Sequence, residues 1–351
     1  MELTVSEIKN DFDFAQYLKI VNSFDFVNPF YRIWAGNLDE VIDERLFYFT
    51  LKGDKQKTLI VMPFLFLKIG SQVEGVTYYD VKSPYGYSGP IFNADVANDT
   101  FITFWILVDA WYKENNVVTE FLRFSLNRNY KFYSGNLIPT LSNVKGEIVS
   151  EDLQWNNFKH KVRNNYRKGV SENLSIHFVQ DATDQQNIEI FHNIYIRTMQ
   201  RINASIEYHY SLNYFQNIIE LSKNDFLLAI VYKGDIPISS ELILISGDTL
   251  FSYLGGTLSE YFNLRPNDFL KIGVIKWARE CQYKYYILGG GRKDNDDLYH
   301  YKKTFFPKDE DEIYYTGRKI IDKPVFEKLN RILNTADSNE NYFPSYRNYV
   351  K

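Results

Sequence analysis

The sequence has few of the residues on which disulfide and metal chemistry depend. Its 351 residues include one cysteine, Cys281, so no disulfide can form within the chain. A secreted scaffold held together by disulfides is therefore excluded. We expect Cys281 to be a small core residue on a helix. The histidines never stand four residues apart and never accompany a cysteine, so we expect no metal site.

Long hydrophobic runs are also missing. The longest apolar stretches, 59–67 and 101–108, are far shorter than the ~20 residues that span a bilayer. The opening segment, MELTVSEIKNDFDF, has neither the basic start nor the apolar stretch of a signal peptide. We therefore expect a cytoplasmic protein with no transmembrane segment, one that could still be peripheral at a membrane. The net charge of −4 means that any polyanion must meet a local basic patch.

Motifs of covalent and phosphate-loop chemistry are absent. The sequence contains no Gly-x-Ser-x-Gly, no Gly-x-Gly-x-x-Gly and no Gly-x-x-x-x-Gly-Lys-Ser/Thr. What it has in abundance is aromatic residues, 17% of the chain, which favour strands and aromatic-lined clefts over a helical bundle. The composition therefore predicts a mixed α/β protein.

A duplication is visible in the sequence. Leu46–Leu67 reads as strand, Lys-Gly-Asp turn and strand, and Leu227–Ser246 repeats this order. Phe104–Ser125 reads as an amphipathic helix followed by a strand, and Phe269–Gly290 is its counterpart. We interpret the chain as two halves with the shared order strand, strand, strand, helix, strand. Chance similarity between α/β segments is the alternative.

The repeat sets the expected boundaries. We place an N-terminal domain at 1–150, a C-terminal domain at 151–325 and a tail at 326–351. Within each Lys-Gly-Asp turn, Gly53 and Gly234 occupy a position at which we expect positive φ.

The second half should open with its own helices. A helix from Phe158 should be closed by Gly169 at its C-terminal end. The next helix should begin with a capping box formed by Thr183 and Gln186. A third should span 211–223, and 325–333 of the tail should also be helical.

The stretch YYILGGGRKDNDDLYHYKKTFF, Tyr285–Phe306, places two lysines in an aromatic run. If the segment after the acidic loop is helical, Lys302 shares an arc with Leu298, Tyr301 and Phe305. Lys302 then either lines a cleft, where it could donate to an oxyanion or phosphate, or extends along the apolar surface to reach water. Lys303 points away from this arc and should be solvated.

A second cationic cluster lies on the first helix of the second half. Five basic residues fall in ten positions that contain no acid, and such a face can hold phosphates. The alternative is an exposed basic helix face with no ligand. The cluster consists of Lys159, Lys161, Arg163, Arg167 and Lys168.

The region 155–306 resembles the Fem family of peptidoglycan bridge-forming aminoacyltransferases. The matching pieces are KVRNNYRKGV, FHNIYIRTMQR, LLAIVYKGDIPISSELILISGDTLFSYLGG, GVIKWARECQYKYYILGGG and LYHYKKTFF. The last piece looks like the family signature Leu-x-x-Phe-Lys-x-x-Phe, with Tyr301 in place of the first Phe. The resemblance implies an α/β (α+β) fold of two tandem GNAT-like (acyl-CoA N-acyltransferase) halves. Each half would be a mixed, mainly antiparallel sheet flanked by helices.

The resemblance also implies site residues. Lys302 matches the lysine at the transfer site and is the expected catalytic residue. Tyr253 matches a tyrosine that contacts a nucleotide-sugar acceptor, and Arg201 falls in the region of an arginine that holds acceptor phosphate. Lys303, with Arg163 and Arg167 of the basic cluster, completes the candidate substrate-binding set.

One family motif of the first half is changed. The segment that looks like the family's Arg-Gly-Pro-x-x-Asp here runs from Ser88 to Asn93 and has neither the Arg nor the Asp. Acyl transfer is expected nonetheless.

The implied reaction is attack of an acceptor amine on an acyl carbonyl through a tetrahedral oxyanion. The resemblance implies aminoacyl-tRNA as donor, with its acceptor stem as partner, an envelope precursor or amino sugar as acceptor, and no tightly bound cofactor. Acyl-CoA is the alternative donor, although Asn267 and Asp268 stand where its pyrophosphate would need glycines. A further alternative is an inactive module that binds a glycan or a partner enzyme. No residue stands out as the general base.

Overall fold

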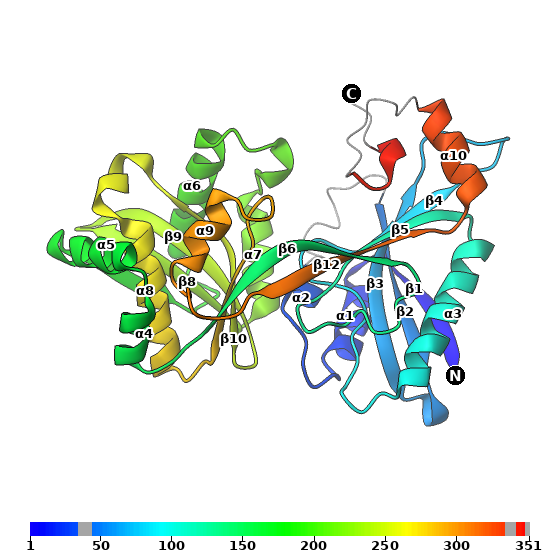
Figure 1. Cartoon of the computed structure of the whole chain (residues 1–351), viewed down its shortest axis with the longest axis horizontal. Helices are drawn as coiled ribbons and strands as arrows, with labels where there is room; N and C mark the ends of the chain where they lie inside the picture. Colours follow the sequence, from blue (N-terminus) through cyan, green and yellow to red (C-terminus); the bar gives the residue numbers. More distant parts are fainter. Residues whose placement is uncertain (34–43, 334–341, 348–351) are drawn as a thin grey trace. The chain divides into compact units, whose positions relative to one another are not determined.

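The computed structural model describes residues 1–33, 44–333 and 342–347. The chain divides into two compact units, labelled by element in Figure 1. Unit 1 comprises Met1–Thr140 together with Tyr314–Lys351, and unit 2 comprises Leu141–Ile313. The expected boundaries at 150 and 325 differ from this division because two strands, described below, leave the half in which the sequence order would place them.

Unit 1 is a mixed sheet with helices on its faces. Its strands follow the order β1-β2-β3-β4-β5-β12, and all neighbours are antiparallel except β4 and β5. Its elements are β1 (Glu2–Ile8), α1 (Asp11–Val21), α2 (Phe30–Ile33), β2 (Glu44–Lys52), β3 (Thr58–Lys68), β4 (Tyr79–Lys82), α3 (Asn98–Glu114), β5 (Val117–Arg123), β12 (Glu312–Ile320) and α10 (Lys323–Ile332).

Unit 2 repeats this plan in the order β6-β11-β10-β9-β8-β7, with β10 and β11 as the parallel pair. Its elements are β6 (Asn136–Glu147), α4 (Glu151–Asn157), α5 (His160–Ser171), β7 (Leu174–Val179), α6 (Gln185–Arg201), α7 (Leu212–Ser222), β8 (Phe226–Lys233), β9 (Ile236–Ser246), β10 (Thr249–Thr257), α8 (Pro266–Glu280), β11 (Tyr285–Gly289) and α9 (Asp297–Lys303).

The expected duplication is present as a fold. The hairpin β2–β3 corresponds to β8–β9, and α3–β5 corresponds to α8–β11, as the two sequence repeats predict. The last strand of each unit comes from the other half of the chain. β6, which follows β5 in the sequence, pairs with β11, whereas β12, which follows α9, pairs with β5. This exchange accounts for the difference in boundaries.

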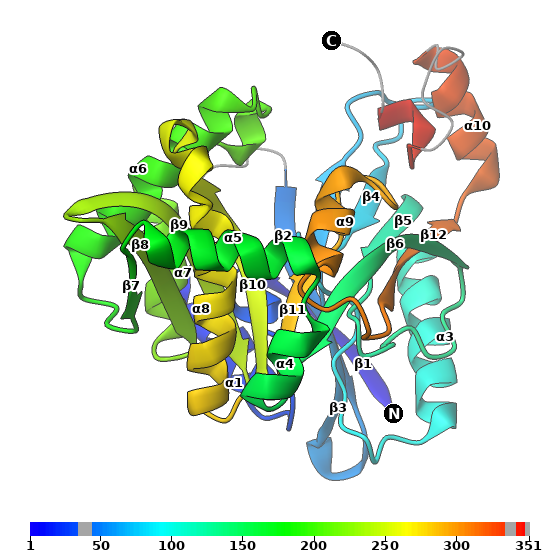
Figure 2. The same cartoon turned by 60° about the vertical axis from the view of Figure 1, so that its left-hand side comes forward.

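Both faces of each sheet are covered. In unit 1, Phe49 and Leu51 pack with α3. Tyr48, which precedes Phe49, lies on the other face of the strand, and its ring lies 5.2 Å from that of Tyr17 of α1. In unit 2, α5 and α8 lie together on one face and α6 on the other, as Figure 2 shows. Strands covered on both sides read as continuous apolar runs, which explains the sequence of β8.

Several local predictions are wrong. Gly234 has the expected positive φ of +59°, but Gly53 has φ −94°, because a short 3₁₀ turn follows it and Gln56 takes the left-handed position. Cys281 is exposed and ends α8 rather than packing in the core. Gly169 is buried inside α5, where it allows close approach of Phe269.

Other helix predictions have mixed outcomes. The cap of α6 is Asp184, whose side chain accepts from the Asn187 N–H, instead of Thr183. The helices at 211–223 and 325–333 are confirmed as α7 and α10. Residues 334–341 and 348–351 of the expected tail lie outside the described residues. No helix among the described residues is long and apolar enough to cross a membrane.

The contact between α6 and β10 gives a test of the packing. A Cβ on Gly256 would lie 2.3 Å from Thr198 Oγ1 and 2.9 Å from the Ile194 carbonyl, and this backbone atom cannot move aside. Gly256→Ala should therefore lower the free energy of unfolding by about 1–3 kcal/mol in urea titration. Gly70→Ala, which meets nothing within 4 Å, is the control and should change stability little. An unchanged unfolding curve for Gly256→Ala would contradict this packing.

Candidate active site in unit 2

A pocket opens where the two parallel strands of unit 2 separate. β10 pairs with β11 from Thr249 to Phe251 and then continues to Thr257 paired with β9 but not with β11, with a bulge between Ser252 and Leu254. The pocket has a volume of about 550 Å³. Its walls come from the part of β10 after Phe251, from β9, from the C-terminal half of α6, from the start of α8 and from α9.

The pocket contains Lys302, the expected catalytic residue. Asp296 caps α9 by accepting from the Tyr299 N–H at 2.9 Å, and its other carboxylate oxygen accepts from the Arg292 and Lys293 N–H groups. The Lys302 Nζ donates to the Gly290 carbonyl at 2.6 Å. The acidic loop thus fixes the start of α9, and the glycine run supplies an acceptor for the lysine.

Burial changes the acid–base behaviour of this amine. Loss of hydration lowers the pKa of Lys302 to about 8, with a further lowering by the charge of Lys271. Glu241 and Asp296 act in the opposite direction. The amine is therefore mostly an ammonium at pH 7, and the proton is lost as the pH rises through about 8. A partly dehydrated ammonium is a stronger hydrogen-bond donor to developing negative charge than a fully hydrated one.

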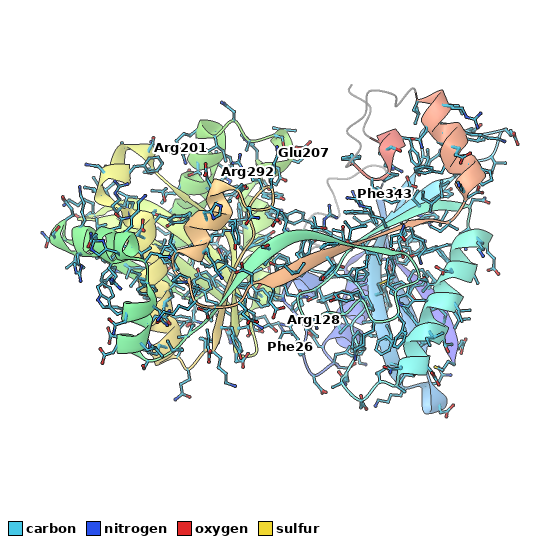
Figure 3. The ribbon with its side chains drawn as sticks, viewed as in Figure 1. Phe26, Arg128, Arg201, Glu207, Arg292 and Phe343 are labelled. Carbon is cyan, nitrogen blue, oxygen red and sulfur yellow. The ribbon has the colours of Figure 1, made fainter. Side chains whose placement is uncertain are left out.

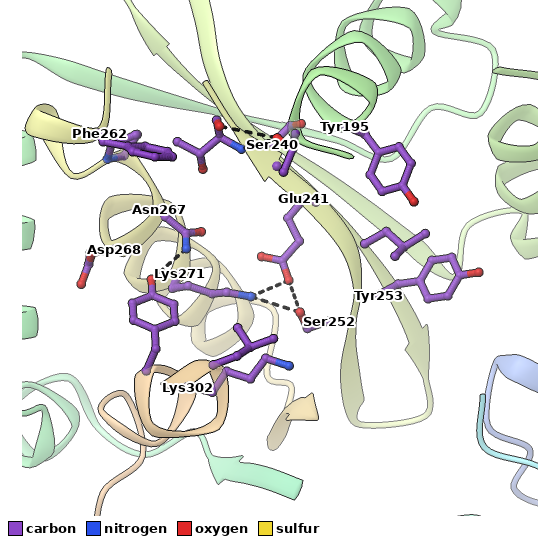
Figure 4. Close-up of a pocket in the computed structure, with 18 of the residues that line it drawn as sticks. Tyr195, Ser240, Glu241, Ser252, Tyr253, Phe262, Asn267, Asp268, Lys271 and Lys302 are labelled. Atoms are coloured by element: carbon purple, nitrogen blue, oxygen red, sulfur yellow. Dashed lines mark hydrogen bonds and ion pairs between the residues drawn. The ribbon is translucent and has the colours of Figure 1, made fainter. Parts of the chain in front are cut away.

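The same pocket contains a buried polar network that sequence reasoning missed. Glu241 Oε1 accepts from Lys271 Nζ at 2.6 Å and from Tyr286 OH at 2.9 Å, as well as from Ser252 Oγ. Lys271 and Glu241 are 6% and 4% exposed. Figure 4 shows Glu241 in the middle of the pocket, with Lys271 and Ser252 at its carboxylate. The available signal was an acid in the apolar strand ELILIS and a lysine in the apolar helix FLKIGVI.

The second oxygen of Glu241 is not satisfied. Among the described residues, Glu241 Oε2 has no hydrogen-bond partner although it is buried. An unpartnered buried carboxylate oxygen is costly, so Glu241 Oε2 is an acceptor still available at the pocket.

The start of α8 forms another wall. Arg265 has a left-handed conformation with φ +62°, and Pro266 begins the helix. Asp268 lies in the first turn, lines the pocket and accepts from Asn165 Nδ2 at 3.1 Å. Burial raises the pKa of Asp268. A carboxylate therefore occupies the helix end at which an anion would otherwise bind.

Three of the expected site residues lie on this pocket. Lys302, Tyr253 and Arg201 all line it, although they come from α9, β10 and α6. The Tyr253 hydroxyl is hydrogen-bonded to that of Tyr214. Arg201 ends α6, as labelled in Figure 3, and its guanidinium lies 4.9 Å from the centre of the Phe262 ring.

The other three do not line the pocket. Lys303 is paired with Asp311 Oδ1 at 2.8 Å and also donates to the Asp309 carbonyl, so it is not solvated as expected. Arg163 donates to three carbonyls, of Trp155, Asn156 and Phe158, and so closes the end of α4. Arg167 is exposed and stacks on Trp155, 5.3 Å from its ring centre. The described residues hold no cluster suited to a metal ion.

This fold and pocket agree with comparisons to known proteins. Residues 156–303 match the family model described as acetyltransferase (GNAT) domain. Unit 2 therefore has the GNAT fold. No match is found among the curated proteins.

Solved structures extend the likeness to both units of the chain. A crystal structure of FemX aligns over 93% of this chain and 99% of its own, with TM-score 0.65 and 13% identity. The L-PGS structure from Bacillus licheniformis aligns over 89% and 93%, with TM-score 0.56 and 12% identity. The C-terminal domain (DUF2156) of a lysylphosphatidylglycerol synthetase candidate from Agrobacterium fabrum aligns over 90% and 93%, with TM-score 0.57 and 11% identity. At such identities these likenesses establish the fold, and they confirm the resemblance to the Fem family at that level.

The acidity of Lys302 in the GNAT fold can be measured directly. Competitive labelling with acetic anhydride across pH, read by mass spectrometry, should give half-maximal reactivity of Lys302 near pH 8. In urea-unfolded protein the same residue should titrate at about pH 10.4. Because desolvation of Lys302 is the largest cause of the shift, a titration that is the same in both states would show that the amine is hydrated.

Proposed function

We propose that unit 2 is an acyltransferase centre that moves an aminoacyl group onto an amine, with Lys302 as the catalytic residue. The observation that carries the proposal is the ammonium of Lys302, held in a pocket of about 550 Å³ with its pKa lowered to about 8 by burial. The GNAT fold of residues 156–303 supports acyl transfer as the reaction type.

The proposed step balances without a cofactor. The nitrogen of the acceptor amine attacks the carbonyl carbon of an aminoacyl ester, a C–N bond forms, and the carbonyl oxygen becomes an oxyanion. Lys302 donates to this oxyanion, and one such donor is worth about 3 kcal/mol. The C–O ester bond then breaks, and the leaving ribose oxygen takes the proton from the amine nitrogen.

The shape of the α8 start favours an aminoacyl donor over acyl-CoA. A GNAT enzyme usually binds the CoA pyrophosphate between the strand equivalent to β10 and the helix equivalent to α8. Here Asp268 lies in the first turn of α8 and faces the pocket, so a pyrophosphate would meet a carboxylate. We therefore propose aminoacyl-tRNA as donor and keep acyl-CoA as the alternative.

Glu241 supports the same choice by another route. Its Oε2 atom is buried in the pocket without a partner among the described residues, while its Oε1 atom is used by Lys271. An aminoacyl group carries an α-ammonium, which can donate to this oxygen, whereas an acetyl group has no such donor. We propose that Glu241 binds the α-ammonium of the transferred group.

The basic face of α5 suits the tRNA part of such a donor. α5 packs against α8, and Asn165 of α5 donates to Asp268 at the pocket wall. Lys159, Lys161 and Lys168 are exposed on this segment. Their charges would neutralise phosphates of the acceptor stem, an attraction that salt weakens.

For the acceptor we propose an amine of an envelope precursor or of an amino sugar. This follows the resemblance to the Fem family, whose fold the chain shares. Tyr253 and Arg201, which line the same pocket as Lys302, are the proposed acceptor contacts.

Lys302→Met tests the central step. The variant should lose about a hundredfold or more in kcat, because one well-aimed donor to the oxyanion is removed. Its melting temperature at pH 7 should be equal or higher, because the folded state holds this ammonium at a pKa below its unfolded value. Activity of the wild type should fall as the pH rises above about 8, where Lys302 loses its proton.

The measurement is release of free amino acid from aminoacyl-tRNA and of thiol from acetyl-CoA, each with a panel of amino sugars and lipid-linked precursors. Equal activity of Lys302→Met and wild type would remove Lys302 from the mechanism. Thiol release without use of aminoacyl-tRNA would favour acyl-CoA as the donor. Silence of the wild type in both assays, together with tight glycan binding, would favour a non-catalytic module.

Glu241→Gln tests the donor. The variant keeps an acceptor oxygen for Lys271 but loses the carboxylate charge, so binding of L-alaninamide, used as a cationic stand-in for the aminoacyl end, should weaken about tenfold. N-acetyl-L-alaninamide, which has no ammonium, should bind the wild type and the variant equally. Equal binding of L-alaninamide by both proteins, measured by calorimetry, would contradict this role.

A further inference from the structure

A second pocket, of about 420 Å³, lies within unit 1. Its floor is built from three adjacent strands, β4, β5 and β12. Lys82 is paired with Phe121, which is paired with Arg318, so these three side chains form one row across the sheet. Arg123 stands two residues beyond Phe121 on the same face.

The segment Tyr342–Arg347 covers this floor. Tyr346 OH donates to Asp80 Oδ1, and Arg347 Nε donates to Asp80 Oδ2 at 2.6 Å. Arg347 also donates to the Leu67 and Lys68 carbonyls. Among the described residues that line the pocket, Asp80 is the one carboxylate, and these hydrogen bonds hold the covering segment to it.

Two arginines of this pocket, Arg123 and Arg318, carry positive charges that no nearby carboxylate of the described residues neutralises. Neither Arg123 nor Arg318 has a carboxylate within ion-pair distance among the described residues. Within the described residues, the Arg123 side chain donates one hydrogen bond, of 3.4 Å, to the Ser83 carbonyl and stacks on Phe121, 5.0 Å from its ring centre. The Arg318 guanidinium lies 5.8 Å from the ring centre of Phe343, a residue labelled in Figure 3. Arg318 Nε is buried and has no hydrogen-bond partner in the described part of the chain.

On the opposite face of β12, the cationic side chain is paired with carboxylates. Lys319, the next residue along β12, is 9% exposed and is paired with Asp109 at 2.5 Å and with Glu120 at 3.4 Å. On one face of the sheet, unit 1 therefore neutralises a buried cation, whereas on the other face Arg318 of β12 and Arg123 of β5 have no carboxylate partner among the described residues. The chain as a whole is acidic, with a net charge of −4, so this surplus is not a consequence of composition.

We propose that this pocket of unit 1 is a binding site for a small molecule that carries phosphate groups. A guanidinium presents parallel N–H donors that match phosphate oxygens, and the donors of Arg123 and Arg318 are largely unused. The aromatic faces of Phe121 and Phe343 hold the guanidiniums in place without consuming those donors. The ligand is either the phosphate group alone or a phosphate joined to a nucleoside, for which the exposed ring of Tyr342 offers a stacking surface.

The site is independent of the proposed acyl transfer. All of its lining residues belong to unit 1, whereas Lys302 and its pocket belong to unit 2.

Calorimetry on the full-length protein tests the site with three probes: orthophosphate, pyrophosphate and uridine diphosphate. Arg123→Gln and Arg318→Gln should each weaken binding by about tenfold to a hundredfold, the loss of one or two charge-assisted hydrogen bonds. Binding by the wild type should also weaken as salt is raised. Pyrophosphate bound as tightly as uridine diphosphate would identify the phosphates as the ligand, and tighter binding of the nucleotide would identify a nucleoside phosphate.

Matched controls separate the site from general effects of charge. Arg45→Gln removes an arginine from β2 of the same unit, where it is paired with Glu7 at 2.7 Å, and should bind all probes as the wild type does. Arg318→Lys keeps the charge but not the paired donors and should recover only part of the affinity. Lys302→Met should bind the probes normally whether or not acyl transfer is observed.

The proposal is overturned if the wild type binds none of the three probes at millimolar concentration. It is also overturned if Arg123→Gln and Arg318→Gln bind as the wild type does. If Arg318→Gln does not fold, as judged by circular dichroism, Arg123→Gln and Arg318→Lys decide the question.

Discussion

The ion pair between Lys271 and Glu241 is the interaction on which the pocket of unit 2 depends. The two groups are almost fully withdrawn from water and lie 2.6 Å apart. Removing either partner would leave a buried charge alone, at a cost of several kcal/mol. Because Ser252 and Tyr286 bond to the same oxygen, the pair also joins β9, β10, β11 and α8 at the point where β10 bulges away from its neighbour.

The pKa of Lys302 depends on its position close to this ion pair. Lys271 and burial lower its pKa, whereas Glu241 and Asp296 limit the lowering. The result is an amine that is poorly hydrated yet still charged near neutral pH, which is what a donor to an oxyanion requires. A fully solvated lysine would be charged but a weaker donor, and without Glu241 the pKa of the buried Lys302 would be lower still.

The two units share one fold but differ in the side chains that line their pockets. Both have a parallel strand pair, an equivalent helix and a final strand supplied by the other half of the chain. In unit 2 the strands separate early and open a pocket with acids and lysines. In unit 1 the corresponding sheet carries aromatic rings and arginines under the covering segment Tyr342–Arg347. The shared fold therefore sets the positions, and the side chains at those positions give the two pockets different charges and shapes.

The sequence by itself predicted the two hairpins, the two helix–strand pairs that make the duplication visible, and the presence of Lys302 on an aromatic helix. These follow from local periodicity and turn chemistry, which act over a few residues. Only the tertiary structure decided the unit boundaries, since the exchange of β6 and β12 is a pairing between residues more than 100 positions apart. It also decided which cations are functional candidates. Lys303 and Arg163 have carboxylate and carbonyl partners in the structure. The ion pair of Glu241 with Lys271, and the lack of carboxylate partners for Arg123 and Arg318 among the described residues, depend on burial and long-range contacts that the sequence does not reveal.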